Sequence, residues 1–222
     1  MNTRKLGVRA DKARSYFEIE KIAFRVRQEL LPTLPITDAV PGVLLFDDYL
    51  LNYPISTQFG PIPVDCSIDK TIVGGEAQSS YCRERHTFLI TLSEESYDDL
   101  ENGGARARFT LAHELGHVVL HPHELLRLSS VPHSIAAYYR GEHQPHKIFY
   151  DTEWQADSFA GAFLMPASGI HDLVGERLLS DNIFRTLSAS MRVADNFDVS
   201  ESAARTRLSK VKTRWRELSM VR

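Results

Sequence analysis

Residues 105–120 read ARARFTLAHELGHVVL, and residues 151–166 read DTEWQADSFAGAFLMP. The first stretch has apolar residues around almost its whole helical circumference and is followed by Pro122, which predicts a buried helix. The second stretch opens with Asp151, a residue suited to an N-cap, and closes with Pro166, which predicts another helix. These two helices carry most of the chemistry that the sequence suggests.

The first helix contains His113, Glu114 and His117 in the pattern HELGH. Residues four apart lie on one helix face, so both imidazoles can bind one ion while Glu114 stands beside it. Metal-assisted hydrolysis needs two neutral nitrogen ligands, an open position for water and a carboxylate that takes the water's proton. Because the other helix faces are apolar, these polar groups need a partner, and the alternative to a metal is a pair of hydrogen-bonded core histidines.

A catalytic zinc site usually has a third protein ligand, and Glu153 at the start of the second helix is the expected one. Asp157 lies one turn later on the same face, where it could accept the outer N–H of a ligand histidine. Two alternatives stay open: Glu153 as a carboxylate favoured by the helix dipole, and Asp157 as the ligand. Gly116 costs about 1 kcal/mol inside a helix, which favours another backbone passing close to it.

His121 extends the series of His113 and His117 by one more turn. We do not expect it to be a ligand, because successive turns of a helix diverge and His121 would draw the ion away from Glu114. We expect it to cap the carbonyl groups at the helix end. The other histidines of this region lie in polar connecting sequence and are expected to be exposed: His123, His133, His143 and His146.

The rest of the chain predicts an α+β fold. Helical spacing of apolar residues indicates a helix at 15–31, and β-rich pieces indicate strands at 42–46, 70–74 and 86–92. The strand at 86–92 could form the sheet edge, where an extended substrate adds as another strand, or it could be an ordinary core strand. Residues after 169 read as helical throughout.

We expect three parts: an N-terminal helical segment at 1–40, a core at 41–170 and a C-terminal helical segment at 171–222. In the last part, 187–210 can be read as a helix-turn-helix, and the tail from Asn182 has nine basic and four acidic residues. We favour a solvated helical face over a DNA-binding surface for its basic residues, which are Arg185, Arg192, Arg205, Arg207, Lys210, Lys212, Arg214 and Arg216.

The composition of the chain predicts its cellular location and excludes some classes of partner. The chain has 222 residues and a net charge of -3, which gives no general reason for binding nucleic acid or anionic membranes. It has no long apolar run and no secretory leader pattern at its start, so we expect a cytoplasmic location and no membrane partner. Cys66 and Cys82 do not form a CxxC pair and are expected to be structural side chains in a reducing compartment.

Two motifs together resemble the ImmA/IrrE-type metallopeptidases of bacteria, phages and mobile elements. They are RFTLAHELGHVVLH at 108–121 and the pattern ExxAxxFAxxFLMP at 153–166, with weaker similarity at the N-terminal helix and at 196–208. The resemblance implies a minimal zincin-like core of the gluzincin type: a small twisted sheet, an active-site helix and a second helix that brings the glutamate ligand. Asp157 stands where the family usually has Asn, which adds negative charge near the metal.

The resemblance also implies a protein substrate, since family members cleave or inactivate transcriptional repressors that are often encoded nearby. The expected function is therefore a zinc-dependent endopeptidase in which Glu114 is the general base, with Mn²⁺ or another divalent cation as alternatives to zinc. The competing classes are a DNA-binding regulator and a metal-stabilised interaction module without catalysis. Candidate donors to a tetrahedral oxyanion are Tyr138, Tyr139, His143, His146 and Tyr150.

Overall fold

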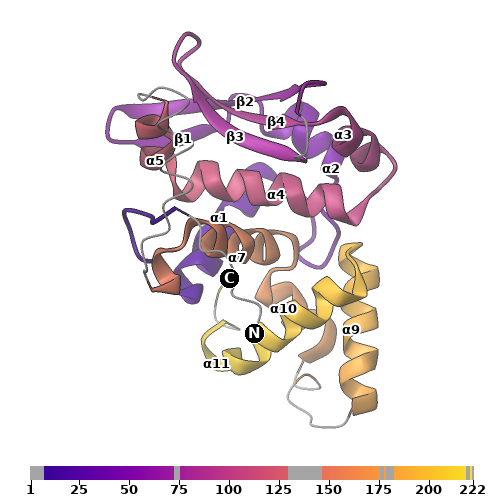
Figure 1. Ribbon diagram of the computed structural model, residues 1–222. Helices are drawn as coiled ribbons and strands as arrows, with labels where there is room; N and C mark the ends of the chain where they lie inside the picture. The colour runs from indigo at the N-terminus through magenta and orange to yellow at the C-terminus, as the bar shows by residue number, and fades with distance from the viewer. Residues whose placement is uncertain are drawn as a thin grey trace, which may run out of the picture.

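A computed structural model describes residues 8–72, 76–129, 147–175, 178, 183–218 and 221. One mixed sheet lies above a group of helices, and the C-terminal helices pack at the far side of that group (Figure 1). The α+β class expected from the sequence is confirmed. The helices are α1 (Tyr16–Leu30), α2 (Gly42–Leu44), α3 (Glu94–Glu101), α4 (Ala105–Leu120), α5 (Pro122–Leu128), α7 (Thr152–Leu164), α8 (Ala167–Val174), α9 (Ile183–Phe197), α10 (Glu201–Thr213) and α11 (Trp215–Leu218).

The sheet has four strands in the order β1-β2-β4-β3. They are β1 (Pro54–Thr57), β2 (Gly60–Ile68), β3 (Ala77–Cys82) and β4 (Thr87–Leu92). β4 runs parallel to β2 and antiparallel to β3, so both of its edges are paired. The expected strand at 86–92 is therefore a core strand, and the idea that it forms the sheet edge is wrong. Its apolar sequence TFLITL suits this interior position, whereas the more polar AQSSYC of β3 suits an edge.

Two of the expected strands are not formed by the residues that the structure describes there. Residues 42–46 lie in α2 and in the π-helical turn η1 (Leu45–Tyr49) that follows it. Leu45, Phe46 and Leu50 are all buried, at a spacing that a helical turn permits and an alternating strand does not. Lys70 and Thr71 lie in a turn after β2, where the Asp69 side chain accepts a hydrogen bond of 2.7 Å from the Thr71 N–H. The end of that expected strand lies outside the described residues.

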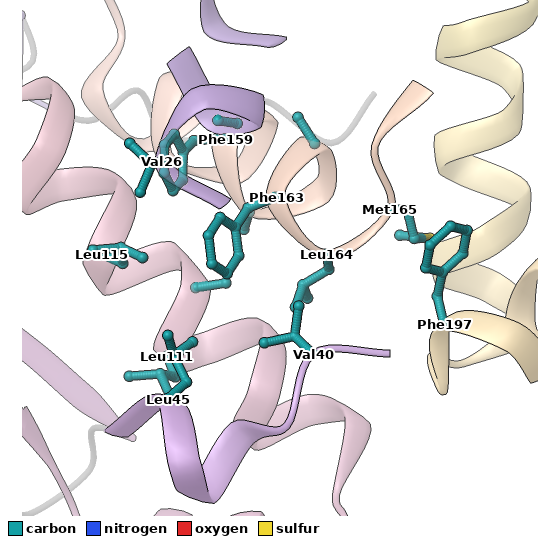
Figure 2. Close-up of a cluster of buried hydrophobic side chains, with 14 of the residues drawn as sticks. Val26, Val40, Leu45, Leu111, Leu115, Phe159, Phe163, Leu164, Met165 and Phe197 are labelled. Atoms are coloured by element: carbon teal, nitrogen blue, oxygen red, sulfur yellow. The ribbon is translucent and has the colours of Figure 1, made fainter. Parts of the chain in front are cut away.

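The helix expected at 15–31 is confirmed as α1, and Ser15 and Glu18 form a capping box at its start. α1 and α4 both pack against α7, whose bounds agree with the predicted helix. The core between them is built from side chains of all three helices, among them Val26, Leu115 and Phe159 (Figure 2). α7 is thus the central helix, held on one side by α1 and on another by α4.

The predicted helix-turn-helix region consists of α9 and α10, joined by three residues, of which Ser200 caps α10. Phe197 at the end of α9 lies beside Met165 (Figure 2). Arg207 of α10 is 2 % exposed, donates its Nε–H to the Met165 carbonyl at 2.9 Å and contacts both carboxylate oxygens of Glu20 at 2.7 Å. The expectation that Arg207 belongs to a solvated face is therefore wrong, because this residue links α10 to α1.

The division of the chain into three parts stays a prediction. The two cysteines are half-buried free thiols. Among the described residues, the helices are all too short or too polar to span a bilayer.

Candidate metal centre

Two helices bring three of the expected residues to one point. The Nε2 atoms of His113 and His117 on α4 are 3.0 Å apart. The Glu153 carboxylate, from the first turn of α7, places one oxygen 3.4 Å from the Nε2 of His113 and the other 3.4 Å from the Nε2 of His117. In the described part of the chain, these three residues form the one group of at least three His, Cys, Asp or Glu donors close enough to hold a metal ion.

The size of this cluster suits a divalent metal ion. Ligand atoms about 2.0–2.1 Å from a tetrahedral zinc ion lie roughly 3.3–3.4 Å from one another. The measured separations of 3.0, 3.4 and 3.4 Å are close to these values. The imidazoles are 17 % and 14 % exposed and the Glu153 side chain is 47 % exposed, so the cluster opens to solvent on the carboxylate side. An open side of this kind leaves room for water as a fourth ligand.

The electrostatics of the cluster favour positive charge. Burial lowers the pKa of His113, but hydrogen bonds with Asp157 and Glu153 and the charge of Glu114 outweigh it and raise that pKa to about 10. Contacts with His113 and His117 hold the pKa of Glu153 far below its ordinary value. A proton and a divalent cation compete for the same ligand nitrogens, so binding of a metal would have to displace the proton that His113 holds in the metal-free site.

Asp157 lies on the outer side of His113. Its Oδ1 is 3.0 Å from the Nδ1 of His113, on the ring edge opposite the nitrogen that faces the cluster. A carboxylate in this position can hold the Nδ1–H tautomer, which leaves Nε2 as the ligand atom. Asp157 is not in the donor cluster, and the alternative in which it replaces Glu153 as ligand receives no geometric support.

Close packing of the two helices sets the position of Glu153. A Cβ atom added to Gly116 would meet the backbone Cα and carbonyl oxygen of Ala156 at 3.2 Å and the Phe159 ring at 3.2 Å. The expected close passage of another backbone at Gly116 is therefore confirmed. Ala156 lies one turn after Glu153, so this contact fixes how near the carboxylate comes to the two imidazoles.

Glu114 lies between the two histidines in sequence and is half-buried on α4. A residue next to His113 is rotated by about 100° around the helix axis, so Glu114 stands beside the direction of the imidazoles. Its charge is one of the causes that raise the pKa of His113. It can therefore act on a molecule at the cluster without joining the three donors.

The expectation that the His121 side chain caps the carbonyl groups at the end of α4 is wrong. Its backbone N–H ends α4 by donating to the His117 carbonyl at 2.9 Å, but its side chain turns inward and is not a cap for the helix carbonyls. His121 is 1 % exposed, its Nδ1 lies 3.2 Å from the Nδ1 of His117 and its Nε2 lies 3.2 Å from the Gln155 Oε1. Burial lowers the pKa of His121 well below its ordinary value, so the ring is neutral.

Of the remaining candidate residues, the structure describes Tyr150 and His123. Tyr150 lies in the 3-10 turn η2 (Ile148–Tyr150), with the Arg9 guanidinium 4.9 Å from its ring centre. His123 is exposed, as expected. Tyr138, Tyr139, His133, His143 and His146 lie outside the described residues.

Gln155 and Arg14 also lie at the site, although neither was predicted from the sequence. Gln155 is completely buried behind the cluster, and its Oε1 also accepts from the Arg14 guanidinium at 3.1 Å. The available signal was a polar residue two positions after Glu153, on a face of α7 that continues with the small or apolar residues Ser158, Phe159 and Ala162.

A cavity of about 490 Å³ lies between α4, α7 and α10. Asp157 lines it, together with Phe109, Gly161 and Ala203, while Arg106 contributes a basic group. The cavity is therefore partly apolar and lies next to the carboxylate that supports His113.

Comparison with known proteins identifies a family for part of the chain. A search of curated proteins finds no match for the chain. The family model of the IrrE N-terminal-like domain, Peptidase_M78, matches residues 101–209, a range that includes α4, α7 and α9. The match indicates a metallopeptidase-type function and implies a divalent metal. Residues 101–209 therefore form an IrrE N-terminal-like domain, which supports the ImmA/IrrE-type family that the two motifs predicted.

Proposed function

We propose that the protein is a zinc-dependent endopeptidase with a zincin-like core, in which His113, His117 and Glu153 bind the metal and Glu114 is the general base. The observation that carries this proposal is the three-donor cluster, with its separations of 3.0, 3.4 and 3.4 Å and its open side. A purely structural zinc site usually closes its fourth position with another protein ligand. The described residues supply no fourth donor at this cluster.

The metal, when bound, would polarise a peptide carbonyl and make a water molecule more acidic. Glu114 removes a proton from the attacking water and later returns it to the leaving amine. Asp157 holds the His113 imidazole in the tautomer that presents Nε2 to the cluster. Glu153 brings the negative charge that balances part of the charge of the cation.

For the substrate, we propose an extended segment of a protein that lies along β3. Within the described residues, β3 pairs with β4 alone, so its other edge is unpaired, and it packs against α4. An extended peptide can add to such an edge through main-chain hydrogen bonds. The cavity beside Asp157 could receive one of its side chains. The family resemblance suggests a transcriptional regulator encoded nearby as the protein that is cleaved.

The competing function is a regulator that binds DNA through α9 and α10. The burial of Arg207 against Glu20 removes one basic residue from that surface and ties α10 to α1. We therefore favour peptide hydrolysis as the activity and regard these helices as part of the packing around α7.

The test is co-expression with the product of the adjacent gene, comparing the wild type with Glu114→Gln and with the exposed control Glu217→Gln. We expect about one zinc ion per chain in all three proteins and a loss of cleavage of roughly 100-fold or more in Glu114→Gln alone. Glu153→Ala should lose the metal as well. Undiminished cleavage by Glu114→Gln, or full zinc content in Glu153→Ala, would contradict the proposal.

A further inference from the structure

A line of buried hydrogen bonds runs from His117 away from the metal cluster. The Nδ1 of His117 is 3.2 Å from the Nδ1 of His121, and the Nε2 of His121 is 3.2 Å from the Gln155 Oε1. His121 is 1 % exposed and Gln155 is completely buried, so water does not compete for these contacts. Each polar atom in the line must therefore be satisfied by its protein neighbour.

The far end of the line fixes the orientation of the Gln155 amide. Its Nε2 donates to the carbonyl oxygens of Lys12 at 3.0 Å and Phe149 at 2.7 Å, and its Oε1 accepts from Arg14 at 3.1 Å. A flipped amide would place oxygen against two carbonyl oxygens and NH₂ against a guanidinium. The Gln155 oxygen must therefore face His121.

This orientation determines every proton along the line. Since the Gln155 Oε1 can only accept, the Nε2 of His121 must be the donor to it. The two nitrogens of His121 face the Gln155 amide and the His117 ring, and neither faces a carboxylate, so a charge on this buried ring would lack a counter-ion and be costly. The uncharged ring then has a lone pair on Nδ1, which accepts from the Nδ1–H of His117. The remaining nitrogen of His117, Nε2, is left with a lone pair directed at the donor cluster.

We propose that His121 and Gln155 are positioning residues that hold His117 as its Nδ1–H tautomer, so that its Nε2 is ready to bind the metal. This inference rests on the proposed metal site and extends it. The two ligand histidines are then supported differently: His113 by the carboxylate of Asp157 and His117 by a neutral chain anchored on the N-terminal segment.

The experiment uses the full chain and zinc as the probe, with His121→Phe, His121→Asn, Gln155→Leu and the control His123→Phe. His121→Phe removes the acceptor and keeps a ring of similar size, while the Oδ1 of an asparagine can replace the lost Nδ1 acceptor. The control alters an exposed histidine two residues later. Zinc affinity is measured by competition with a chelating dye, and unfolding of the metal-free proteins shows whether each variant folds.

We expect His121→Phe and Gln155→Leu to bind zinc about 10 to 100 times more weakly, as is usual when the partner of a ligand histidine is lost. His121→Asn should recover most of this loss, and His123→Phe should bind like the wild type. In the zinc-loaded wild type, long-range proton–nitrogen NMR should show a proton on the Nδ1 of His117 and on the Nε2 of His121. This readout does not depend on whether a variant folds.

Wild-type zinc affinity in folded His121→Phe, or a proton on the Nδ1 of His121, would overturn the inference while leaving the proposed peptidase intact. Failure of the wild type to bind zinc would instead remove the metal site itself, and with it both proposals. The two failures are therefore distinguishable.

Discussion

Replacing Gly116 with alanine would place a methyl group in the closest contact between α4 and α7. The new Cβ would lie 3.2 Å from the Cα and carbonyl oxygen of Ala156, whereas carbon contacts are most favourable at about 3.5–4.0 Å. α7 would have to retreat by roughly half an ångström, and Glu153, one turn earlier on the same helix, would move with it. A metal site tolerates errors of only about 0.2 Å in its ligand distances.

Gly116→Ala should therefore weaken zinc binding by roughly tenfold or more, measured by competition with a chelating dye. The gain in helix propensity is about 1 kcal/mol and the cost of overpacking is about 1–3 kcal/mol, so the free energy of unfolding of the metal-free protein should fall by about 0–2 kcal/mol.

Gly161→Ala is the matched control, because a Cβ added there meets only the Cδ of Arg207 at 3.8 Å. This change should stabilise α7 by up to about 1 kcal/mol and leave zinc affinity unchanged. If Gly116→Ala behaved like Gly161→Ala in both measurements, the idea that this contact sets the position of Glu153 would be refuted.

Two further predictions concern parts of the molecule away from the cluster. Arg207→Met should lower the free energy of unfolding by about 3–5 kcal/mol in chemical denaturation, because it leaves Glu20 buried without its partner, whereas the double change to Met at both positions should restore much of that loss. A cost below about 1 kcal/mol for the single change would contradict the structural role of this pair. Burial raises the pKa of Cys66 to about 12, while hydrogen bonds with the Arg85 backbone and side chain lower the pKa of Cys82. Since the thiolate is the reactive form, iodoacetamide at pH 8 should modify Cys82 at least about ten times faster than Cys66, as read by peptide mass spectrometry, and equal rates would count against these shifts.

The parts of the fold that depend on local sequence signals were predictable. The helix at 105–120 and the helix at 151–166 have apolar periodicity, a cap and a terminating proline, and both appear as α4 and α7. Two sequence features predicted the three members of the donor cluster. They are the spacing of the HELGH motif and the position of Glu153 close to the start of a helix. The small side chains at Gly116 and Ala156 indicated that the helices approach closely.

The parts that depend on long-range packing were not predictable in the same way. Whether a strand lies at the edge or in the interior depends on which strands pair, and the sequence at 86–92 left this open. The apolar run at 42–46 fits a strand as well as a buried turn, and only the burial of Leu45 and Phe46 shows which one forms. Arg207 and His121 read as surface or helix-end residues because their partners, Glu20 and Gln155, are distant in sequence.

The packing of α1 and the sheet against the helices has a consequence for anyone who works with a shortened protein. The recognisable domain begins at residue 101, but α1 covers α7 and the strands lie before that point. A fragment trimmed to 101–209 would uncover the face of α7 that α1 protects and would lose the anchors that Lys12 and Arg14 provide for Gln155. Large uncovered apolar surfaces promote aggregation, so the boundaries of recognisable homology are a poor guide to where this protein can be cut.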